Sequence, residues 1–393
     1  MIMKVLQVHN KYIYSGGEDR VVEDEKNLLI KNNCEVFQLI KKNRDEINSL
    51  LDQLKVSKNL IYSKPSKDIM VRKLKEINPN IVHIHNTFPL WSFSILDACY
   101  EMKIPVVMTL HNFRLICAKG IFYRDNKICE LCLKSSSLNA IKYGCYQDSR
   151  IKSIPVSLMI KRYNKGLSLL KKINKVITLT KFTKKKFLEA NFPENKLSIK
   201  PNFIFDNIII KSNVKKKGFL CASRLSEEKG ILDLIKAHKE FKFDLKICGD
   251  GPLKKHLINY RLIKYLGFLN KEKLHQELNS TKFLIFPSNC YEGFPIILLE
   301  AFAFNTIVIA PNLGSISNII KDKYNGILFK PNDIEDLINK IKWVLKNDNE
   351  CEKIKINAKK VLIEKYSEKQ NFKQLLDIYE AAIKENKNNK LFN

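Results

Sequence analysis

Residues 283–311 read FLIFPSNCYEGFPIILLEAFAFNTIVIAP, and they predict a strand, a helix and a second strand. The two ends are short apolar runs rich in β-branched and aromatic residues, a pattern typical of buried strands. Pro295 is well suited to the first turn of the helix between them. Glu292 and Glu300 bracket seven uncharged residues, whereas a surface helix would interleave polar residues and a buried strand would carry no glutamate. The two carboxylates therefore predict a ligand nearby.

The same alternation of apolar strands and amphipathic helices runs along the whole chain. Strands are expected at 3–9, 35–40, 81–85, 105–111, 176–180, 218–223, 243–249, 263–268, 283–288, 306–311 and 326–329. Between them lie helical stretches such as Arg20–Lys31 and Val71–Ile77, and the alternation pauses only at 203–217, where we place a linker. The predicted fold class is therefore α/β, with two doubly wound Rossmann-like domains facing a central cleft.

The domain boundaries follow from this pause. The first domain is expected to span 1–205 with a cysteine-rich insertion at 114–150, and the second to span 206–368. A helix and tail at 369–393 lie far in sequence from the last strand of the second sheet, so we expect this helix to cross back to the first domain. Ligands bind at the carboxyl ends of parallel strands, which predicts the active site in the cleft.

Length and composition agree with this organisation. The chain has 393 residues and 45% hydrophobic residues, enough for two or three well-packed domains. The start MIMKVLQVHN reads directly as a strand rather than as a signal peptide, and no apolar run approaches the roughly 18 residues of a membrane span. We expect a cytoplasmic protein, either soluble or attached peripherally to the inner face of the plasma membrane.

The positive charge is large and unevenly distributed. The chain carries 69 basic and 41 acidic residues, and residues 114–200 alone hold 20 basic and 5 acidic side chains. A lysine-rich proteome explains a diffuse excess of charge better than a concentrated one. The aromatic residues do not form an interleaved stacking platform, so we expect no nucleic-acid partner. An anionic membrane surface is the expected partner of this stretch.

Two loops that follow predicted strands suit phosphate groups. Gly16 and Gly17 lie between the first strand and its helix, where backbone N–H groups can approach an anion closely, although an ordinary turn would look the same. Arg224 and Lys229 follow the first strand of the second domain, and two cations there suit a diphosphate. A solvated charged turn is the alternative for this second loop.

The loop and helix start at 288–300 extend this donor site. The exposed amides of Phe294, Ile296 and Ile297 would seat a phosphate. Glu300, about one turn further in, can accept hydrogen bonds from sugar hydroxyls, and Glu292 would point at the cleft. Carboxylates beside phosphates suit a ligand that presents hydroxyl groups as well, and a nucleotide sugar is such a ligand.

The motifs in their order resemble the retaining glycosyltransferases of family 4 (group 1), which have the glycosyltransferase-B fold. The similarity runs from Met3 to about residue 385, through SGGED, IVHIHNTFPL, PVVMTLHNFRLIC, SRLSEEKG, ICGDGP, PSNCYEGFPIILLEAFAF and NGILFKPND. The chain differs from the family at three positions. Ser223 and Asn305 stand where glycine is common, and Asn318 stands where an acidic residue is common.

The resemblance implies a role for each candidate residue. Arg224 and Lys229 would hold the donor diphosphate, Glu300 the ribose hydroxyls, and Glu292 the transferred sugar. Gly16 and Gly17 would shape the loop opposite. His111 would lie beside the donor sugar and the acceptor, although a buried structural histidine is the alternative; His83 and His85 share one side of a strand and fit either a core or a cleft role.

The implied reaction is transfer of a sugar from a nucleotide-diphosphate sugar to a hydroxyl of a glycan or lipid-linked acceptor, in surface polysaccharide or lipid-linked glycan synthesis. With no well-placed carboxylate nucleophile, front-face attack fits, and with no Asp-x-Asp clamp we expect no catalytic metal. Two alternatives stay open: a sugar-nucleotide epimerase of the same fold, and a non-catalytic nucleotide-sugar-binding protein.

Four of the ten cysteines lie within 29 residues. Cys117, Cys129, Cys132 and Cys145 have the spacing Cys-x11-Cys-x2-Cys-x12-Cys, which predicts a structural zinc site of four thiolates. The stretch has little regular period and many lysines, so we expect it to need a metal to fold around. Four separate cysteines, some buried as small hydrophobic residues, are the alternative.

Overall fold

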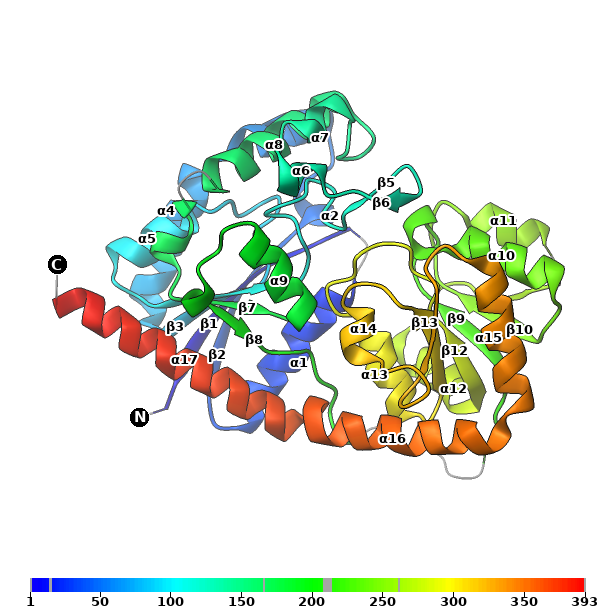
Figure 1. Ribbon diagram of the computed structural model, residues 1–393. Coiled ribbons are helices and arrows are strands. Elements are labelled where there is room, and N and C mark those ends of the chain that lie inside the picture. The colour runs from blue at the N-terminus through cyan, green and yellow to red at the C-terminus, as the bar shows by residue number, and fades with distance from the viewer. Residues whose placement is uncertain (1, 14–15, 165–166, 208–213, 261, 392–393) are drawn as a thin grey trace. The chain divides into compact units, whose positions relative to one another are not determined.

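The computed structural model describes residues 2–13, 16–164, 167–207, 214–260 and 262–391 (Figure 1). The chain forms two compact units. The first contains Met1–Phe122, Glu130–Asn202 and Asn371–Asn393, and the second contains Tyr123–Cys129 and Phe203–Gln370. Part of the predicted linker, 208–213, lies outside the described residues.

The first unit is built on a six-stranded parallel sheet with the order β2-β1-β3-β4-β7-β8. The strands are β1 (Lys4–Lys11), β2 (Glu35–Lys42), β3 (Ile81–Ile84), β4 (Val106–Leu110), β7 (Lys175–Thr178) and β8 (Leu197–Ile199). The helices are α1 (Gly17–Lys31), α2 (Asn43–Glu46), α3 (Leu50–Asn59), α4 (Lys64–Ile77), α5 (Ile95–Glu101), α6 (Leu131–Lys134), α7 (Asn139–Lys142), α8 (Arg150–Asn164) and α9 (Lys181–Glu189). Because helices cover both faces, the central strands β3 and β4 are buried throughout.

Helix α1 shows how local sequence sets these boundaries. Its N-cap, Gly16, has no side chain, and the Asp19 carboxylate in the first turn accepts the Gly16 N–H at 3.2 Å. Val21, Val22 and Leu28 are buried on its inner face. The helix therefore starts directly after the loop that follows β1, which brings its first turn to the carboxyl end of the sheet.

The C-terminal helix α17 (Glu368–Leu391) packs on the first sheet, as predicted (Figure 1). Leu375, Tyr379 and Ala382 are buried in one core with residues of β1, β3, β4 and β7. Glu385 adds ion pairs to Lys175 and to a second lysine of the same unit. A segment from the far end of the sequence thus completes the first unit.

The second unit contains a six-stranded parallel sheet with the order β11-β10-β9-β12-β13-β14. The strands are β9 (Lys217–Ala222), β10 (Leu245–Cys248), β11 (Lys264–Tyr265), β12 (Thr281–Ile285), β13 (Ile307–Pro311) and β14 (Ile327–Phe329). The helices are α10 (Ile231–Glu240), α11 (Lys254–Asn259), α12 (Lys271–Ser280), α13 (Ile296–Ala303), α14 (Ile316–Ile319), α15 (Ile334–Lys346) and α16 (Asp348–Tyr366). The predicted fold class is confirmed, and the strand order reverses between β9 and β12, which is where ligands bind in such sheets.

The cysteine-rich stretch folds around aromatic side chains. Phe113 is fully buried and stacks near Phe122 and Phe187, with ring centroids 5.0 and 6.1 Å away. The Arg114 guanidinium lies over the rings of Phe88 and Tyr146, 4.7 and 5.5 Å from their centroids, and donates to the Ala118 carbonyl. Only a two-residue hairpin, β5 (Tyr123–Arg124) with β6 (Lys127–Ile128), adds strand structure in the described part of this stretch. We expected a metal to organise the fold of this stretch, and apolar and cation–π packing around Phe113 and Arg114 does so instead.

Candidate functional site

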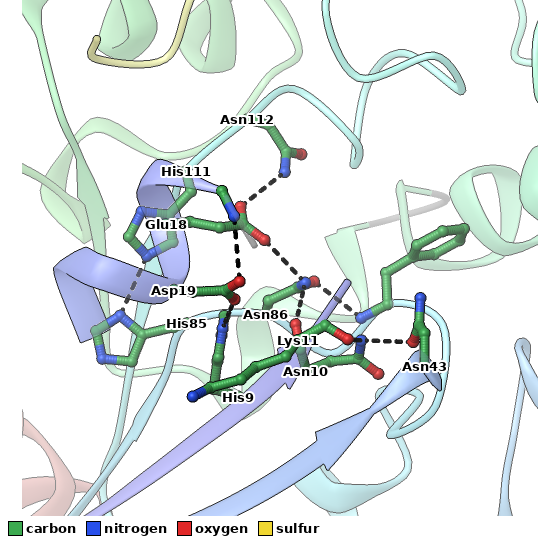
Figure 2. A network of polar contacts seen from close by, with 12 residues as sticks. His9, Asn10, Lys11, Glu18, Asp19, Asn43, His85, Asn86, His111 and Asn112 are labelled. Atoms are coloured by element: carbon green, nitrogen blue, oxygen red, sulfur yellow. Dashed lines mark hydrogen bonds and ion pairs between the residues drawn. The ribbon is translucent and has the colours of Figure 1, made fainter. Parts of the chain in front are cut away.

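In the first unit, the dipeptide His-Asn occurs at the carboxyl end of three neighbouring strands. His9-Asn10 lies in the last three residues of β1, His85-Asn86 follows β3 and His111-Asn112 follows β4. Since β1, β3 and β4 are adjacent in the parallel sheet, the three dipeptides lie at one edge (Figure 2). This edge includes the reversal of strand order between β1 and β3, the expected position of a ligand site.

The three histidine rings form a row. His85 and His111 are stacked with centroids 5.4 Å apart, and His85 Nδ1 lies 3.1 Å from His111 Nε2. His9 stands edge-on to His85, 6.4 Å away, and its Nε2 lies 2.7 Å from Asp19 Oδ1. Burial lowers the pKa of His85 to about 3 and holds that of His111 well below its usual range, so both rings are neutral near pH 7.

A buried carboxylate, Glu25 of α1, lies behind His85. Its Oε1 is 2.9 Å from His83 Nδ1 and 3.2 Å from His85 Nε2, and its Oε2 is 3.1 Å from Lys200 Nζ. Burial alone would raise its pKa, but His83 and Lys200 outweigh burial and hold the pKa of Glu25 well below its usual range. Glu25 is therefore ionised inside the protein, and the Lys200 ammonium balances its charge.

Glu18, in the first turn of α1, is held between two asparagines of the His-Asn pairs. Asn86 Nδ2 donates to its Oε1 at 3.1 Å and Asn112 Nδ2 donates to its Oε2 at 3.5 Å (Figure 2). Burial, followed by the charge of Asp19, raises the pKa of Glu18 to about 8. This carboxyl group is thus largely protonated at neutral pH, next to the predicted Gly16-Gly17 loop.

The predicted catalytic residue His111 lines a small cavity of about 40 Å³ in the first unit. His85, Asn86, Phe88 and Arg114 also line it. The cavity opens at the carboxyl ends of β3 and β4 and combines polar groups with apolar side chains, as sugar-binding pockets do. His85 therefore lies on the cavity side, whereas His83 is in the core, bonded to Tyr379 and Thr109.

In the second unit, the loops after β9 and β12 meet through Lys229 and Glu292. Lys229 Nζ lies 2.5 Å from Glu292 Oε1, and the Ser288 hydroxyl donates to the same oxygen at 2.6 Å. Burial of Lys229 favours its neutral form, but the Glu292 charge outweighs burial and the pKa of Lys229 is raised. Gly230 allows this approach, because it has a φ of +68° and a Cβ there would lie 1.9 Å from the Pro287 carbonyl oxygen.

The other predicted donor residues lie around these loops. Arg224 is exposed in the loop after β9. Helix α13 begins at Ile296 with Pro295 as N-cap, and no side chain caps it, so the amides of Ile296 and Ile297 are at its start, with the buried Phe294 just before. Asn305, at the end of this helix, has a φ of +52°, a conformation that asparagine tolerates well.

Glu300 is more enclosed than a residue that binds sugar hydroxyls was expected to be. Its side chain is 2% exposed, and its Oε1 lies 2.7 Å from Nε2 of His275 on α12. His275 itself is 18% exposed. Glu300 therefore forms a pair with His275 rather than presenting an open carboxylate, and its contact with ribose stays a prediction.

The four cysteines of the predicted zinc site are not gathered in the structure. Among the described residues, three or more His, Cys, Asp or Glu whose ligand atoms lie within 4.8 Å of one another could hold a metal ion. Glu25, His83 and His85 meet this criterion, and the four cysteines do not. Cys117 is buried, and Cys129, Cys132 and Cys145 are half-buried. Zinc binding by these cysteines stays a prediction that this geometry does not support.

The Glu25–His83–His85 group is poorly suited to a divalent cation. Lys200 occupies one carboxylate oxygen of Glu25, and both ring nitrogens of His83 already have partners in Tyr379 and Thr109. A cation at this place would meet the buried ammonium of Lys200. The cluster is better described as a buried Glu25–Lys200 charge pair with the rings of His83 and His85 beside the carboxylate.

Sequence reasoning predicted His111 and the second-unit residues but missed Glu18, Glu25, Asn86 and Asn112. A signal was present: VHN at 8–10, IHN at 84–86 and LHN at 110–112 each lie at the carboxyl end of a predicted strand. A His-Asn repeated after three strands of one parallel sheet predicts a cluster at one edge. Glu25 carried no such signal, because it lies inside an ordinary amphipathic helix pattern.

Comparisons with known proteins agree with the fold and the motifs. The profile of Glycosyltransferase Family 4 matches residues 16–206, and that of Glycosyl transferases group 1 matches residues 204–361. The uncharacterized glycosyltransferase MJ1178 of Methanocaldococcus jannaschii is 26% identical over 376 residues, which cover 88% of this chain and 90% of that protein. MJ1607 of the same organism is 31% identical over 235 residues, covering 53% of this chain and 60% of that protein.

Among solved structures, Anabaena Alr3699/HepE in complex with UDP-glucose has a TM-score of 0.65 and 16% identity, and the match covers 96% of this chain and 99% of that one. At this identity the likeness concerns the fold, which is the glycosyltransferase-B fold predicted from the sequence. The two profiles together run from residue 16 to residue 361. The chain therefore belongs to the family 4, group 1 glycosyltransferases.

Proposed function

We propose that this protein transfers a sugar, with retention of configuration, from a nucleoside-diphosphate sugar to a hydroxyl of an acceptor. The observation that carries the proposal is the Lys229–Glu292 pair at the strand-order reversal of the second sheet, beside the uncapped start of α13. A cation and a helix start stabilise a leaving diphosphate, and a carboxylate beside them binds hydroxyls of the transferred sugar.

Each predicted residue has a role in this reaction. Arg224 and Lys229 neutralise the departing diphosphate, and the amides of Ile296 and Ile297 add donors to its oxygens. Glu292 orients the transferred sugar, and Glu300, with His275, binds the ribose. The acceptor hydroxyl attacks the face that the diphosphate leaves, and a diphosphate oxygen takes its proton, so the protein supplies electrostatic stabilisation rather than a nucleophile.

The first unit would supply the acceptor side. The cavity lined by His111, His85 and Arg114 is the candidate for the sugar hydroxyls near the reacting carbon. Gly16 and Gly17 lie beside Glu18, whose raised pKa leaves its carboxyl group largely protonated at neutral pH. A glycan or lipid-linked acceptor, in surface polysaccharide or lipid-linked glycan synthesis, is the class we propose.

The surface of the first unit supports attachment to an anionic membrane from the cytoplasmic side. Helices α3 and α8 pack beside each other and expose large apolar side chains. These are Leu51, Leu54, Ile151, Ile154 and Leu158, with exposed Lys55, Lys58, Lys152, Lys161 and Arg162 around them. We call these ten residues the α3–α8 surface. Among the described residues, none of the helices is long and apolar enough to cross a bilayer; apolar groups ringed by cations suit a peripheral attachment.

A donor screen tests the proposal. Purified protein is incubated with labelled UDP-, GDP- and dTDP-sugars, with and without a lipid-linked acceptor, starting with UDP-glucose because the Anabaena neighbour was solved with it. Acceptor-dependent appearance of a glycosylated product is the expected result. Conversion of the donor sugar without acceptor would instead indicate an epimerase, and tight binding without any turnover would indicate a binding protein.

A further inference from the structure

We propose that Glu25 and His85 are positioning residues that hold His111 in one tautomer, with Nε2 protonated and Nδ1 left to accept a hydrogen bond from a sugar hydroxyl. This inference rests on the proposed function, because a hydroxyl-bearing ligand is what the acceptor atom serves. It is carried by a chain of contacts from Glu25 through His85 to His111 (Figure 2 draws the His85–His111 step).

The first step is the charge of Glu25. Lys200 Nζ lies 3.1 Å from Oε2, and the side chains of Glu25 and Lys200 are 1% and 3% exposed. A buried carboxylate paired with a buried ammonium stays ionised, because protonating it would leave Lys200 uncompensated. Glu25 therefore presents a negative oxygen to its other neighbours.

The second step fixes the proton of His85. Its Nε2 lies 3.2 Å from Glu25 Oε1, at ion-pair distance but without the alignment of a full hydrogen bond. A lone pair on Nε2 would face the carboxylate oxygen and be repelled, whereas an N–H there is attracted. His85 is buried and neutral, so it carries one ring proton, and that proton belongs on Nε2.

The third step passes this choice to His111. With its proton on Nε2, His85 has an unprotonated Nδ1, which lies 3.1 Å from His111 Nε2. Two unprotonated nitrogens at that distance would repel each other, so His111 Nε2 carries the proton and donates it to His85. The remaining nitrogen, His111 Nδ1, is then an acceptor only, on a ring that lines the cavity.

Consequently the cavity presents a fixed acceptor at His111, matched to donors such as sugar hydroxyls. Without this constraint, His111 would populate both tautomers. In part of the molecules Nδ1 would then carry the proton and could not accept a hydrogen bond from a hydroxyl. The same cluster reaches helix α17 through His83, whose Nδ1 lies 2.7 Å from the Tyr379 hydroxyl. His83 Nδ1 also lies 2.9 Å from Glu25 Oε1, but removal of the Tyr379 hydroxyl leaves the Glu25 charge and its Lys200 partner in place, so this branch provides an internal control.

The direct test is the protonation state of His111 in protein labelled with 15N-histidine, whose protonated and unprotonated ring nitrogens differ widely in chemical shift. The His111 signals are assigned by their loss in His111→Gln. We expect a protonated Nε2 and an unprotonated Nδ1 at pH 7. A protonated Nδ1 would overturn the inference, and because no substrate is present this result would leave the proposed function untouched.

Variants of Glu25 test the chain of contacts. Glu25→Gln removes the charge that orients His85, and we expect a mixed or reversed His111 tautomer, with kcat lowered about 10- to 100-fold and the donor KM little changed. Glu25→Asp keeps the charge, and we expect the wild-type tautomer and a kcat above that of Glu25→Gln. Tyr379→Phe, which removes a hydrogen bond from the His83 branch, should retain wild-type kcat. Equal losses in Glu25→Gln and Tyr379→Phe, with His111 unchanged in both, would show a merely structural cluster.

Discussion

Lys229 and Glu292 are 63 residues apart in the chain, yet the ammonium and the carboxylate lie 2.5 Å apart. The pair links the loops after β9 and β12, the two strands on either side of the strand-order reversal. Backbone contacts hold the same loops together, since the Asn289 N–H donates to the Glu228 carbonyl at 2.8 Å. The cation and the carboxylate are thus fixed relative to each other before any donor arrives, which is what electrostatic stabilisation requires.

Removing the cations of this site should cost catalysis. For Arg224→Ala and Lys229→Ala we expect a loss of about 2–4 kcal/mol of transition-state stabilisation, roughly 30- to 1,000-fold in kcat/KM, because each change removes a charge-assisted contact to the leaving diphosphate. Lys236→Ala, which removes a mostly exposed lysine of α10, is the matched control. Near-wild-type turnover in either Arg224→Ala or Lys229→Ala would rule out the diphosphate role.

The Glu300–His275 pair makes a second prediction about the donor. Glu300→Gln should weaken binding of the free nucleotide while leaving the fold intact, because the amide can still meet His275 but no longer carries charge toward the ribose hydroxyls. The expected change is about 10-fold or more in Kd, measured by calorimetry with the nucleoside diphosphate. An unchanged Kd would mean that Glu300 serves only to pack α12 against α13.

The contribution of His85 to stability should be lost as the pH falls. The pKa of His85 is lowered to about 3 in the folded protein, mainly by burial, against about 6.5 for an unfolded chain. Between these values the unfolded chain binds more protons than the native protein, so the stability present above pH 6.5 is lost progressively on acidification. The lowered pKa of Glu25 acts in the same direction at still lower pH.

Urea unfolding at pH 7.5 and pH 5.5 measures this effect. We expect acidification to disfavour folding more in the wild-type protein than in His85→Gln, which has no group to protonate at that position. The raised pKa of Glu18 acts in the opposite direction in both proteins, so the difference between them isolates His85. A pH dependence equal in both proteins would assign the effect to other groups.

Binding to membranes should depend on both parts of the α3–α8 surface. We expect the protein to bind anionic vesicles and to release from them as salt is raised, because exposed charge attraction is screened. Leu54→Ser and Ile151→Ser should weaken binding without changing its salt dependence, since they remove apolar contact only. Ile356→Ser, at an exposed apolar residue of α16, is the control. Equal binding to anionic and neutral vesicles would contradict the charge component.

Metal analysis tests whether the four cysteines of residues 117–145 bind zinc. The cysteine spacing predicts about one zinc per chain in protein purified without a chelator. Cys129→Ser with Cys132→Ser would then release the metal. Absence of zinc, with Cys117, Cys129, Cys132 and Cys145 all reactive toward a thiol reagent in the folded protein, would leave the aromatic packing around Phe113 and Arg114 as what organises this stretch.

The sequence was sufficient for the sheets because each buried parallel strand is a short apolar run between helical stretches. It missed β8, which has only three residues (Leu197–Ile199) and a partly exposed edge position. It placed Lys229 and Glu292 in the loops after β9 and β12, where the structure has them, since the motifs and the strand ends coincide. It could not show that Glu300 contacts His275. That contact joins α12 and α13, and a local sequence pattern does not predict which side chains of two helices face each other.

The network around His85 was beyond sequence reasoning for a similar reason. Its members come from α1, β3, β4 and the segment after β8, and hydrogen bonds between segments so distant leave no periodic trace. Lys200 in particular reads as one more lysine in a basic stretch, yet it is 3% exposed and neutralises Glu25. Composition shows that lysine and arginine are in excess, but it does not show which of these side chains are buried.

The position of α17 has a consequence for recombination between relatives. The first unit takes its sheet from the beginning of the gene and its closing helix, with Tyr379 against His83, from the end. A hybrid made by a single crossover near residue 205 would therefore combine one parent's sheet with the other parent's helix, and mismatched side chains at Leu375 and Tyr379 would disturb the core. Donor specificity should be exchangeable between such enzymes only by a double crossover, which replaces the second unit and restores the original C-terminus.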